Sequence, residues 1–134
     1  MSSFDRERVA GLLADDAYAT GLGIELVEVS DEEIVVAMRV TEAHTNFLGG
    51  GHGGVVFSLA DCALSLASNS AVDPAVAIDA HFVLTAGSRP GDRLEARIRE
   101  SSRGRTLGTY RADVTRSDGR TVALFTGTVY INRA

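Results

Sequence analysis

Residues 55–70 have the sequence VVFSLADCALSLASNS, which contains no Gly or Pro and is apolar almost all round a helical projection. This pattern is typical of a helix buried on most sides and not of one that lies on a surface. The segment is too short to span a membrane, which takes about 20 apolar residues. We therefore predict a central helix over residues 55–70 that other elements must surround.

Strand-like segments flank this helix on both sides in the sequence. They share a high content of β-branched residues or an alternation of apolar and polar residues, and turn-forming residues separate them. Two precede the helix and four follow it: residues 24–29, 34–40, 76–85, 93–101, 106–116 and 121–131. One buried helix and six antiparallel strands predict an α+β fold in which a strongly curved sheet wraps the helix.

The N-terminal segment has helical periodicity. Apolar residues recur at helical spacing between Phe4 and Ala17, behind Ser3 and acidic residues that suit a helix start. Gly21 and Gly23 then end the pattern. We predict one amphipathic helix over residues 4–20.

The composition narrows the class of protein. The chain has 134 residues, 45% hydrophobic and 23% charged, which predicts a single globular domain over residues 1–134. Its net charge of −5 argues against nucleic acid as a partner, although all 13 basic residues are Arg, which can still form a local site for an anion. The single cysteine, Cys62, predicts no disulfide, and the sequence has no metal-ligand motif and no apolar leader. We expect a cytoplasmic protein with no metal and no membrane contact.

Asp61 lies in the middle of the apolar helix, where carboxylates are seldom found without a partner. The helix positions three and four residues away hold only Phe, Ser and Leu, so no salt bridge can form along the helix. A residue of another strand or subunit could supply a partner, and Asp61 would then have a structural role. The functional alternative is a nucleophile or general base.

Residues 41–54, TEAHTNFLGGGHGG, place five glycines directly before the helix, which predicts a shaped loop. Because His52-Gly53-Gly54 lead into the first turn, unpaired backbone N–H groups and the positive end of the helix dipole lie there. The N–H of Gly53 could bind an oxygen on which negative charge develops. Asn46 and His52 add a side-chain donor and an imidazole to this loop, whose simpler interpretation is a flexible entry to the helix.

The other polar residues are weaker candidates. His44 and His81 have no accompanying ligand motif, so we expect them in surface or core roles. Cys62 fits a small core residue, and Asp79 is a second buried acid or, equally, an outward strand residue. Arg103 and Arg105, on either side of Gly104, could hold phosphates or simply form a solvated hairpin turn.

Together, these residues resemble the hotdog-fold acyl-CoA thioesterases of the phenylacetic acid degradation (PaaI-like) type. The shared pattern comprises Asn46, Gly49, the triplet His52-Gly53-Gly54 and, within the helix, Leu59-Ala60-Asp61. The turn 90–92, the segment 103–106 and the run 122–128 are also similar, so the resemblance covers most of the chain. It implies a hotdog fold, dimers with active sites at their interface, and association of dimers into a homotetramer.

The resemblance also implies roles for the loop and the helix. Asp61 of one subunit faces the partner's loop, where it attacks the thioester or activates water. The Gly53 amide polarises the thioester carbonyl, while Asn46 and His52 orient the carbonyl or the water.

Further residues are implied to bind the acyl-CoA substrate. Gly54 and Phe47 border the reacting group, and Arg103 or Arg105 hold the phosphates of CoA. No cofactor is implied, because CoA is part of the substrate.

Two departures from the family bear on the substrate. Some relatives carry a Ser or Thr on the strand after the helix that helps to place the catalytic water, but Ala77 stands nearest to that position. Phe47 and Leu48 also make the loop bulkier and more apolar. The acyl group therefore need not be hydroxyphenylacetyl, and we expect an acyl-CoA thioesterase for aromatic (phenylacetyl-type) or medium-chain acyl groups. The alternatives are a noncatalytic acyl-CoA-binding hotdog module and a hotdog hydratase or dehydratase, whose usual His-Phe-Pro-Gly loop is missing.

Overall fold

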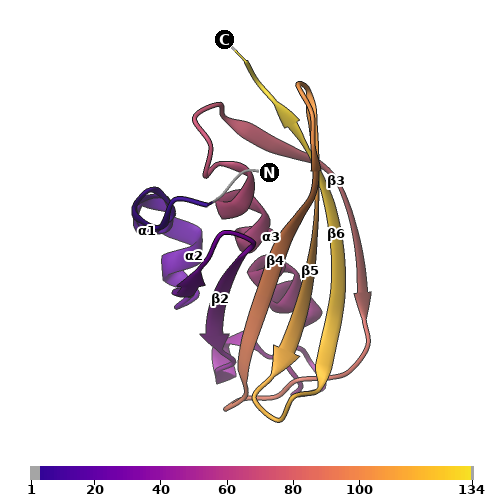
Figure 1. The fold of residues 1–134 in the computed structure, drawn as a ribbon. Coiled ribbons are helices and arrows are strands. Elements are labelled where there is room, and N and C mark those ends of the chain that lie inside the picture. The colour runs from indigo at the N-terminus through magenta and orange to yellow at the C-terminus, as the bar shows by residue number, and fades with distance from the viewer. Residues whose placement is uncertain (1–3, 134) are drawn as a thin grey trace.

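The computed structural model describes residues 4–133, which form a six-stranded antiparallel sheet with the strand order β1-β2-β4-β5-β6-β3. Figure 1 shows this sheet curving around α3, with α1 and α2 on the other side of that helix. The predicted α+β layer is therefore confirmed. The elements are α1 (Arg6–Asp15), α2 (Ala17–Gly21), β1 (Glu25–Val29), β2 (Glu33–Arg39), the 3-10 helix η1 (Glu42–His44), α3 (Gly53–Ser68), β3 (Ala75–Leu84), β4 (Arg93–Arg103), β5 (Leu107–Arg116) and β6 (Thr121–Ile131).

The central helix α3 begins and ends two residues before the predicted limits. Nine of its 16 residues are buried, and they include Leu59, Ala60, Ala63 and Leu64. Burial of a Leu side chain stabilises a fold by about 1.5–3 kcal/mol, so this helix anchors the core. A narrow strip through Gly54, Ser58, Asp61 and Ser65 is less buried, and this strip carries the carboxylate.

The sheet bends around the helix through irregular pairings. The register shifts in four of the five strand pairs, at Leu26/Glu28, Ala77/Asp79, Glu100/Ser102 and Val114/Thr115. Such bulges increase the local twist of a sheet. Close approach of the helix also needs a small residue on β6, because a Cβ at Gly127 would lie 2.8 Å from the Leu64 side chain.

The N-terminal segment differs from the prediction of one helix over residues 4–20. It forms two helices, α1 and α2, that separate at Asp16. Asp16 has extended backbone angles, and its carboxylate accepts a hydrogen bond from the Ala19 N–H at 2.9 Å, so it caps α2 and ends the continuous helix. The cap of α1 is Asp5; the predicted start at Ser3 lies outside the described residues.

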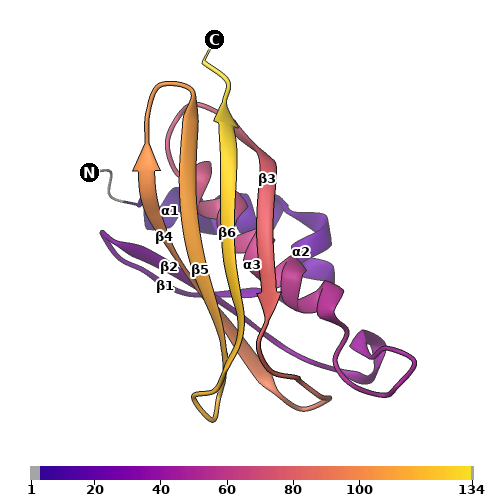
Figure 2. The same ribbon diagram turned by 90° about the vertical axis from the view of Figure 1, so that its right-hand side faces the viewer.

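Figure 2 shows β3 at one edge of the sheet, on the same side as the loop between β2 and α3. Eight of the ten residues of β3 are exposed. They include four large apolar residues, Val76, Ile78, Val83 and Leu84. Unpaired edges of this kind are templates for pairing with another strand. Among residues 4–133, no helix is long and apolar enough to cross a membrane.

Candidate active site

The loop that leads from β2 into α3 is fixed by hydrogen bonds of its own. Asn46 Oδ1 accepts the backbone N–H groups of Leu48, at 2.9 Å, and Gly50, at 3.3 Å. The N–H of His52 donates to the carbonyl of His44 at 2.8 Å, which closes the loop at its base. The oxygen of Asn46 is therefore engaged inside the loop, whereas its Nδ2 hydrogens are not bonded to any described residue.

The start of α3 is organised by His52. Its Nδ1 accepts the N–H of Gly54 at 2.8 Å, and its carbonyl accepts the N–H of Val55 at 3.0 Å. Because Nδ1 is the acceptor, a neutral His52 ring carries its proton on Nε2. No described residue accepts the N–H of Gly53. This N–H is thus an unpaired donor at the positive end of the central helix, the geometry that stabilises an oxyanion.

Asp61 lies two turns further along α3 and is partly buried. Within the described chain, no hydrogen bond or ion pair reaches its carboxylate. Burial raises the pKa of Asp61 above its ordinary value, and the negative charge of Asp16 raises it further. The adjacent Cys62 is buried, and its pKa rises to about 12, mainly because of burial, so this thiol is a neutral core group as predicted.

The geometry of a helix separates Gly53 and Asp61 within one chain. They are eight residues apart, and a rise of about 1.5 Å per residue puts them about 12 Å apart along the axis. One reacting carbonyl needs both the oxyanion donor and the base or nucleophile within about 3 Å. A single chain therefore does not bring Gly53 and Asp61 to the same carbonyl group.

The structure places the other predicted site residues in two regions. Phe47 and Leu48 form the tip of the loop and are 96% and 81% exposed. Ala77 lies on the edge strand β3, whereas Arg103 and Arg105 lie at the end of α3 opposite to the loop. His44 caps its own turn by accepting the N–H of Thr41.

Arg103 is tied to the C-terminal end of α3. Its Nη1 donates to the carbonyl of Ser68 at 3.1 Å and to the hydroxyl of Tyr110 at 2.8 Å, and that hydroxyl donates to Glu100. Tyr110 is fully buried, and desolvation raises its pKa to about 12 despite the nearby guanidinium. A cation here also opposes the negative end of the helix dipole. The contacts give Arg103 a structural role, whatever it binds.

We expect Arg103→Met to destabilise the protein by about 1–3 kcal/mol, because the buried Tyr110 hydroxyl and the last turn of α3 lose a charged donor. Arg105→Met, at the exposed hairpin tip, is the matched control and should change the free energy of unfolding by less than about 0.5 kcal/mol. Urea unfolding at neutral pH measures both. Equal stabilities of the two variants would contradict this role for Arg103.

Sequence reasoning missed two residues that act on the candidate site, Asp16 and Ser88. The negative charge of Asp16 raises the pKa of Asp61. Asp is a preferred N-cap residue, so the position of Asp16 directly before Ala17–Gly21 was the signal that could have identified it as a helix cap. Ser88 is brought to the loop only by the tertiary fold: its carbonyl accepts the N–H of Gly51 at 2.8 Å. The Ser88 Oγ is buried without a hydrogen-bond partner among the described residues.

Gly51 has no room for a side chain. A Cβ there would lie 2.1 Å from Ser88 Oγ and 3.2 Å from the Ser88 backbone, whereas one at Gly50 would make an ordinary 3.6 Å contact. We expect Gly51→Ala to displace the loop and lower kcat/KM about tenfold or more, because small misplacements of positioning groups are costly. Gly50→Ala should stay near wild type. Rates of hydrolysis of a thioester, the substrate class that the resemblance implies, measure the difference, and equal rates for the two variants would contradict it.

A family model described as the thioesterase superfamily matches residues 48–123, a range that contains Gly53 and Asp61. Among curated proteins, a putative esterase of Deinococcus radiodurans is 43% identical over 84% of this chain and 77% of its own length. The acyl-coenzyme A thioesterase PaaI of Escherichia coli is 35% identical over 84% of this chain and 81% of its own length.

Solved structures agree with these relationships. The E. coli PaaI protein superimposes with a TM-score of 0.90 at 32% identity, covering 96% of this chain and 93% of its own. A hypothetical thioesterase of Streptococcus pneumoniae, solved with coenzyme A, has a TM-score of 0.77 at 26% identity, covering 81% of this chain and 85% of its own. The expected hotdog fold is confirmed.

Proposed function

The chain belongs to the thioesterase superfamily as an acyl-CoA thioesterase of the PaaI type, and we propose that it hydrolyses aromatic or medium-chain acyl-CoA thioesters with Asp61 as nucleophile or general base. One observation carries this proposal: Asp61 is an uncompensated carboxylate on the same helix whose first N–H, that of Gly53, is unpaired. These two groups supply the base or nucleophile and the oxyanion donor that thioester hydrolysis needs.

The separation along α3 supports a site in which the two groups act across a subunit interface. We propose that two chains pair along their β3 edges, so that Asp61 of one chain meets Gly53 of its partner. The exposed apolar residues Ile78 and Leu84 of β3 and the exposed tip of the loop at Phe47 and Leu48 support such an interface. Dimers then associate into a tetramer, as the resemblance to the PaaI-like thioesterases implies.

In this arrangement the partner's Gly53 N–H donates to the thioester carbonyl as negative charge develops on its oxygen. Asp61 either removes a proton from water, whose oxygen then bonds to the carbonyl carbon, or attacks that carbon itself to give an anhydride that water hydrolyses. In both routes the C–S bond breaks and the thiolate of CoA leaves, taking up a proton. The Nδ2 group of Asn46 and the Nε2 proton of His52 are the donors left to orient the carbonyl or the water.

The residues of the loop between β2 and α3 support the proposed class of acyl group. Phe47 and Leu48 add apolar surface beside the entrance to α3, and Gly54 lets the substrate approach the backbone there. An apolar lining suits aryl and medium-length alkyl groups. Arg105, exposed at the hairpin tip, is the stronger candidate for the CoA phosphates, since Arg103 is engaged with Ser68 and Tyr110.

Release of free CoA thiol from a panel of aryl and alkyl acyl-CoA thioesters tests the function. We expect turnover, with phenylacetyl-CoA or medium-chain thioesters among the best substrates. Intact thioesters throughout the panel, together with tight binding of acyl-CoA, would overturn hydrolysis and favour a noncatalytic binding module.

A further inference from the structure

A hollow of about 620 Å³ lies on the outer face of the sheet, away from α3. Its polar and charged lining residues alternate along β4, β5 and β6 with buried residues such as Ile98, Val114 and Ala123. Figure 2 looks onto this outer face, which no helix of residues 4–133 covers. The sheet thus separates the hollow from Asp61 and from the loop.

The strand register arranges polar residues of the hollow, together with Glu33 beside it, in a row across five strands. Successive cross-strand partners are Glu33, Arg99, Arg111, Thr126 and His81, contributed by β2, β4, β5, β6 and β3 in that order. Arg99 and Arg111 are therefore directly opposite each other. Like charges in that position destabilise a sheet unless a counter-charge is present.

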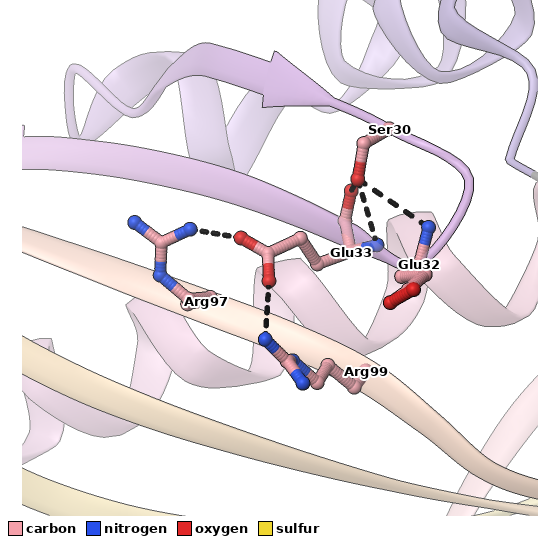
Figure 3. A network of polar contacts seen from close by, with 5 residues as sticks. All are labelled: Ser30, Glu32, Glu33, Arg97 and Arg99. Atoms are coloured by element: carbon pink, nitrogen blue, oxygen red, sulfur yellow. Dashed lines mark hydrogen bonds and ion pairs between the residues drawn. The ribbon is translucent and has the colours of Figure 1, made fainter.

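The protein supplies only part of that counter-charge. Glu33 is 8% exposed, and its two carboxylate oxygens bind Arg97 and Arg99, the second at 2.9 Å, as Figure 3 shows. Its charge is thus shared by two guanidinium groups. The Arg111 guanidinium has no hydrogen bond or ion pair to any described residue.

The formal charges of the Arg, Asp and Glu residues in and beside the hollow leave an excess of one positive charge. Three Arg line the hollow together with Asp113, which stands across the strands from Arg97, and Glu33 lies beside the hollow, bonded to two of these Arg. The excess matches a monoanion. Arg guanidinium groups bind carboxylates through paired N–H donors, and the Thr126 hydroxyl is placed beside Arg111 as a further donor.

The other side of the hollow is apolar. In the neighbouring row, Leu124 on β6 pairs with Val83 on β3, and their exposed fractions are 46% and 40%. One hollow therefore combines guanidinium donors with an apolar wall, and its volume lies in the usual range for small-molecule sites, about 300–1,000 Å³. A bare inorganic anion would leave this wall in water.

We propose that the hollow binds an organic carboxylate with an aryl or alkyl body, whose carboxylate lies between Arg99 and Arg111 and whose body lies on Leu124 and Val83. Two sources share this chemistry. One is the acid released by the proposed thioester hydrolysis, a link that rests on the proposed function, and the other is an unrelated metabolic carboxylate.

Calorimetric titration of the folded protein with phenylacetate and hexanoate tests the site. Phenylacetamide, which has the same body without charge, and inorganic phosphate are the comparison ligands. We expect both carboxylates to bind, Arg111→Gln to weaken them about tenfold, and Arg120→Gln, an arginine in the β5–β6 turn outside the hollow, to leave binding unchanged. A titration with succinate distinguishes the two sources of the carboxylate. If succinate binds more weakly than phenylacetate, the ligand is the acid released by hydrolysis, and if succinate binds more tightly, the ligand is an unrelated metabolic carboxylate.

Thermal unfolding supplies a second measurement. Arg111→Gln should itself raise the melting temperature, because it removes the repulsion with Arg99, and phenylacetate should raise the melting temperature of wild type more than that of the variant. Equal carboxylate binding in wild type and Arg111→Gln would overturn the proposed site. A change of oligomeric state in Arg111→Gln would also overturn it, because this face would then bind a second copy of the chain. Release of CoA thiol from acyl-CoA is measured on the same wild-type and Arg111→Gln samples. This assay tests the proposed function separately from the binding of the carboxylate.

Discussion

Asp61→Asn is expected to lower kcat/KM for the best acyl-CoA substrate by at least about a hundredfold while the fold stays intact. Asn keeps the size of the side chain but can neither attack a thioester carbonyl nor accept a proton from water. Since no described residue bonds to the Asp61 carboxylate, its replacement by Asn breaks no hydrogen bond or ion pair of the described chain. Release of CoA thiol under saturating and subsaturating substrate measures the loss.

The stability of the same variant separates a chemical from a structural role. The folded-state pKa of Asp61 is raised, so the folded protein binds this proton more tightly than the unfolded chain does. The contribution of Asp61 to stability therefore falls as pH rises from the ordinary Asp pKa to the raised one, and it stays unfavourable above that window. Asp61→Asn should consequently be as stable as wild type, or more stable, at neutral pH. A clear loss of stability would indicate a structural carboxylate.

The pH profile of activity reports the same group. Because the ionised carboxylate does the chemistry, kcat/KM should fall on the acid side with an apparent pKa above the ordinary Asp value. Asp16→Asn removes a neighbouring negative charge but keeps a residue that can cap α2, so it should move this acid limb to lower pH. An unmoved limb in a folded Asp16→Asn protein would show that another group controls it.

Much of this architecture follows from local patterns in the sequence. The apolar stretch at 55–70 and the six alternating segments predict the helix and strands, because burial of one helix by a curved sheet leaves few other arrangements. The break between α1 and α2 is missed, since the apolar spacing runs through it. It depends on one side chain, Asp16, that bonds to the backbone and favours a cap over a continuous helix.

The candidate site is predictable only in part, for a geometric reason. Glycines before a helix predict the unpaired N–H of Gly53, and an unpartnered acid in an apolar helix singles out Asp61. The acceptor role of His52 Nδ1 and the contact of Gly51 with Ser88 depend on atomic positions that no spacing encodes. The facing pair Arg99 and Arg111 likewise emerges only once the strand register is known.

Gly53→Pro is expected to lower kcat/KM by about a hundredfold to a thousandfold, as loss of one oxyanion donor does elsewhere. The substitution removes the N–H of Gly53, and Pro is well tolerated at the first position of a helix. The preceding residue, His52, has φ −69° and ψ 131°, which is the conformation that a following Pro favours. The helix should therefore form normally while the donor is absent.

Gly53→Ala is the matched control for this variant. A Cβ at this position would lie 2.8 Å from Leu84 Cδ1, so both substitutions push on the same flexible side-chain end. Only the Pro variant loses the N–H, and the ratio of the two activities isolates the donor from the steric effect. If Gly53→Ala were as inactive as Gly53→Pro, the loss would come from packing against Leu84 and the oxyanion role would fail.

Co-expression of the two inactive chains, Asp61→Asn and Gly53→Pro, tests whether the site spans two subunits. In a symmetric dimer of one chain of each kind, one site combines both defects, whereas the other combines an intact Asp61 with an intact Gly53. A heterodimer purified through two different tags should therefore regain about half of the wild-type activity, although each parent is inactive. If Asp61 and Gly53 acted within one chain, every site would carry a defect and no activity would return. Return of activity therefore shows a site between subunits, and its absence shows a site within one chain. We expect activity to return, because about 12 Å of helix separates the two groups in each chain.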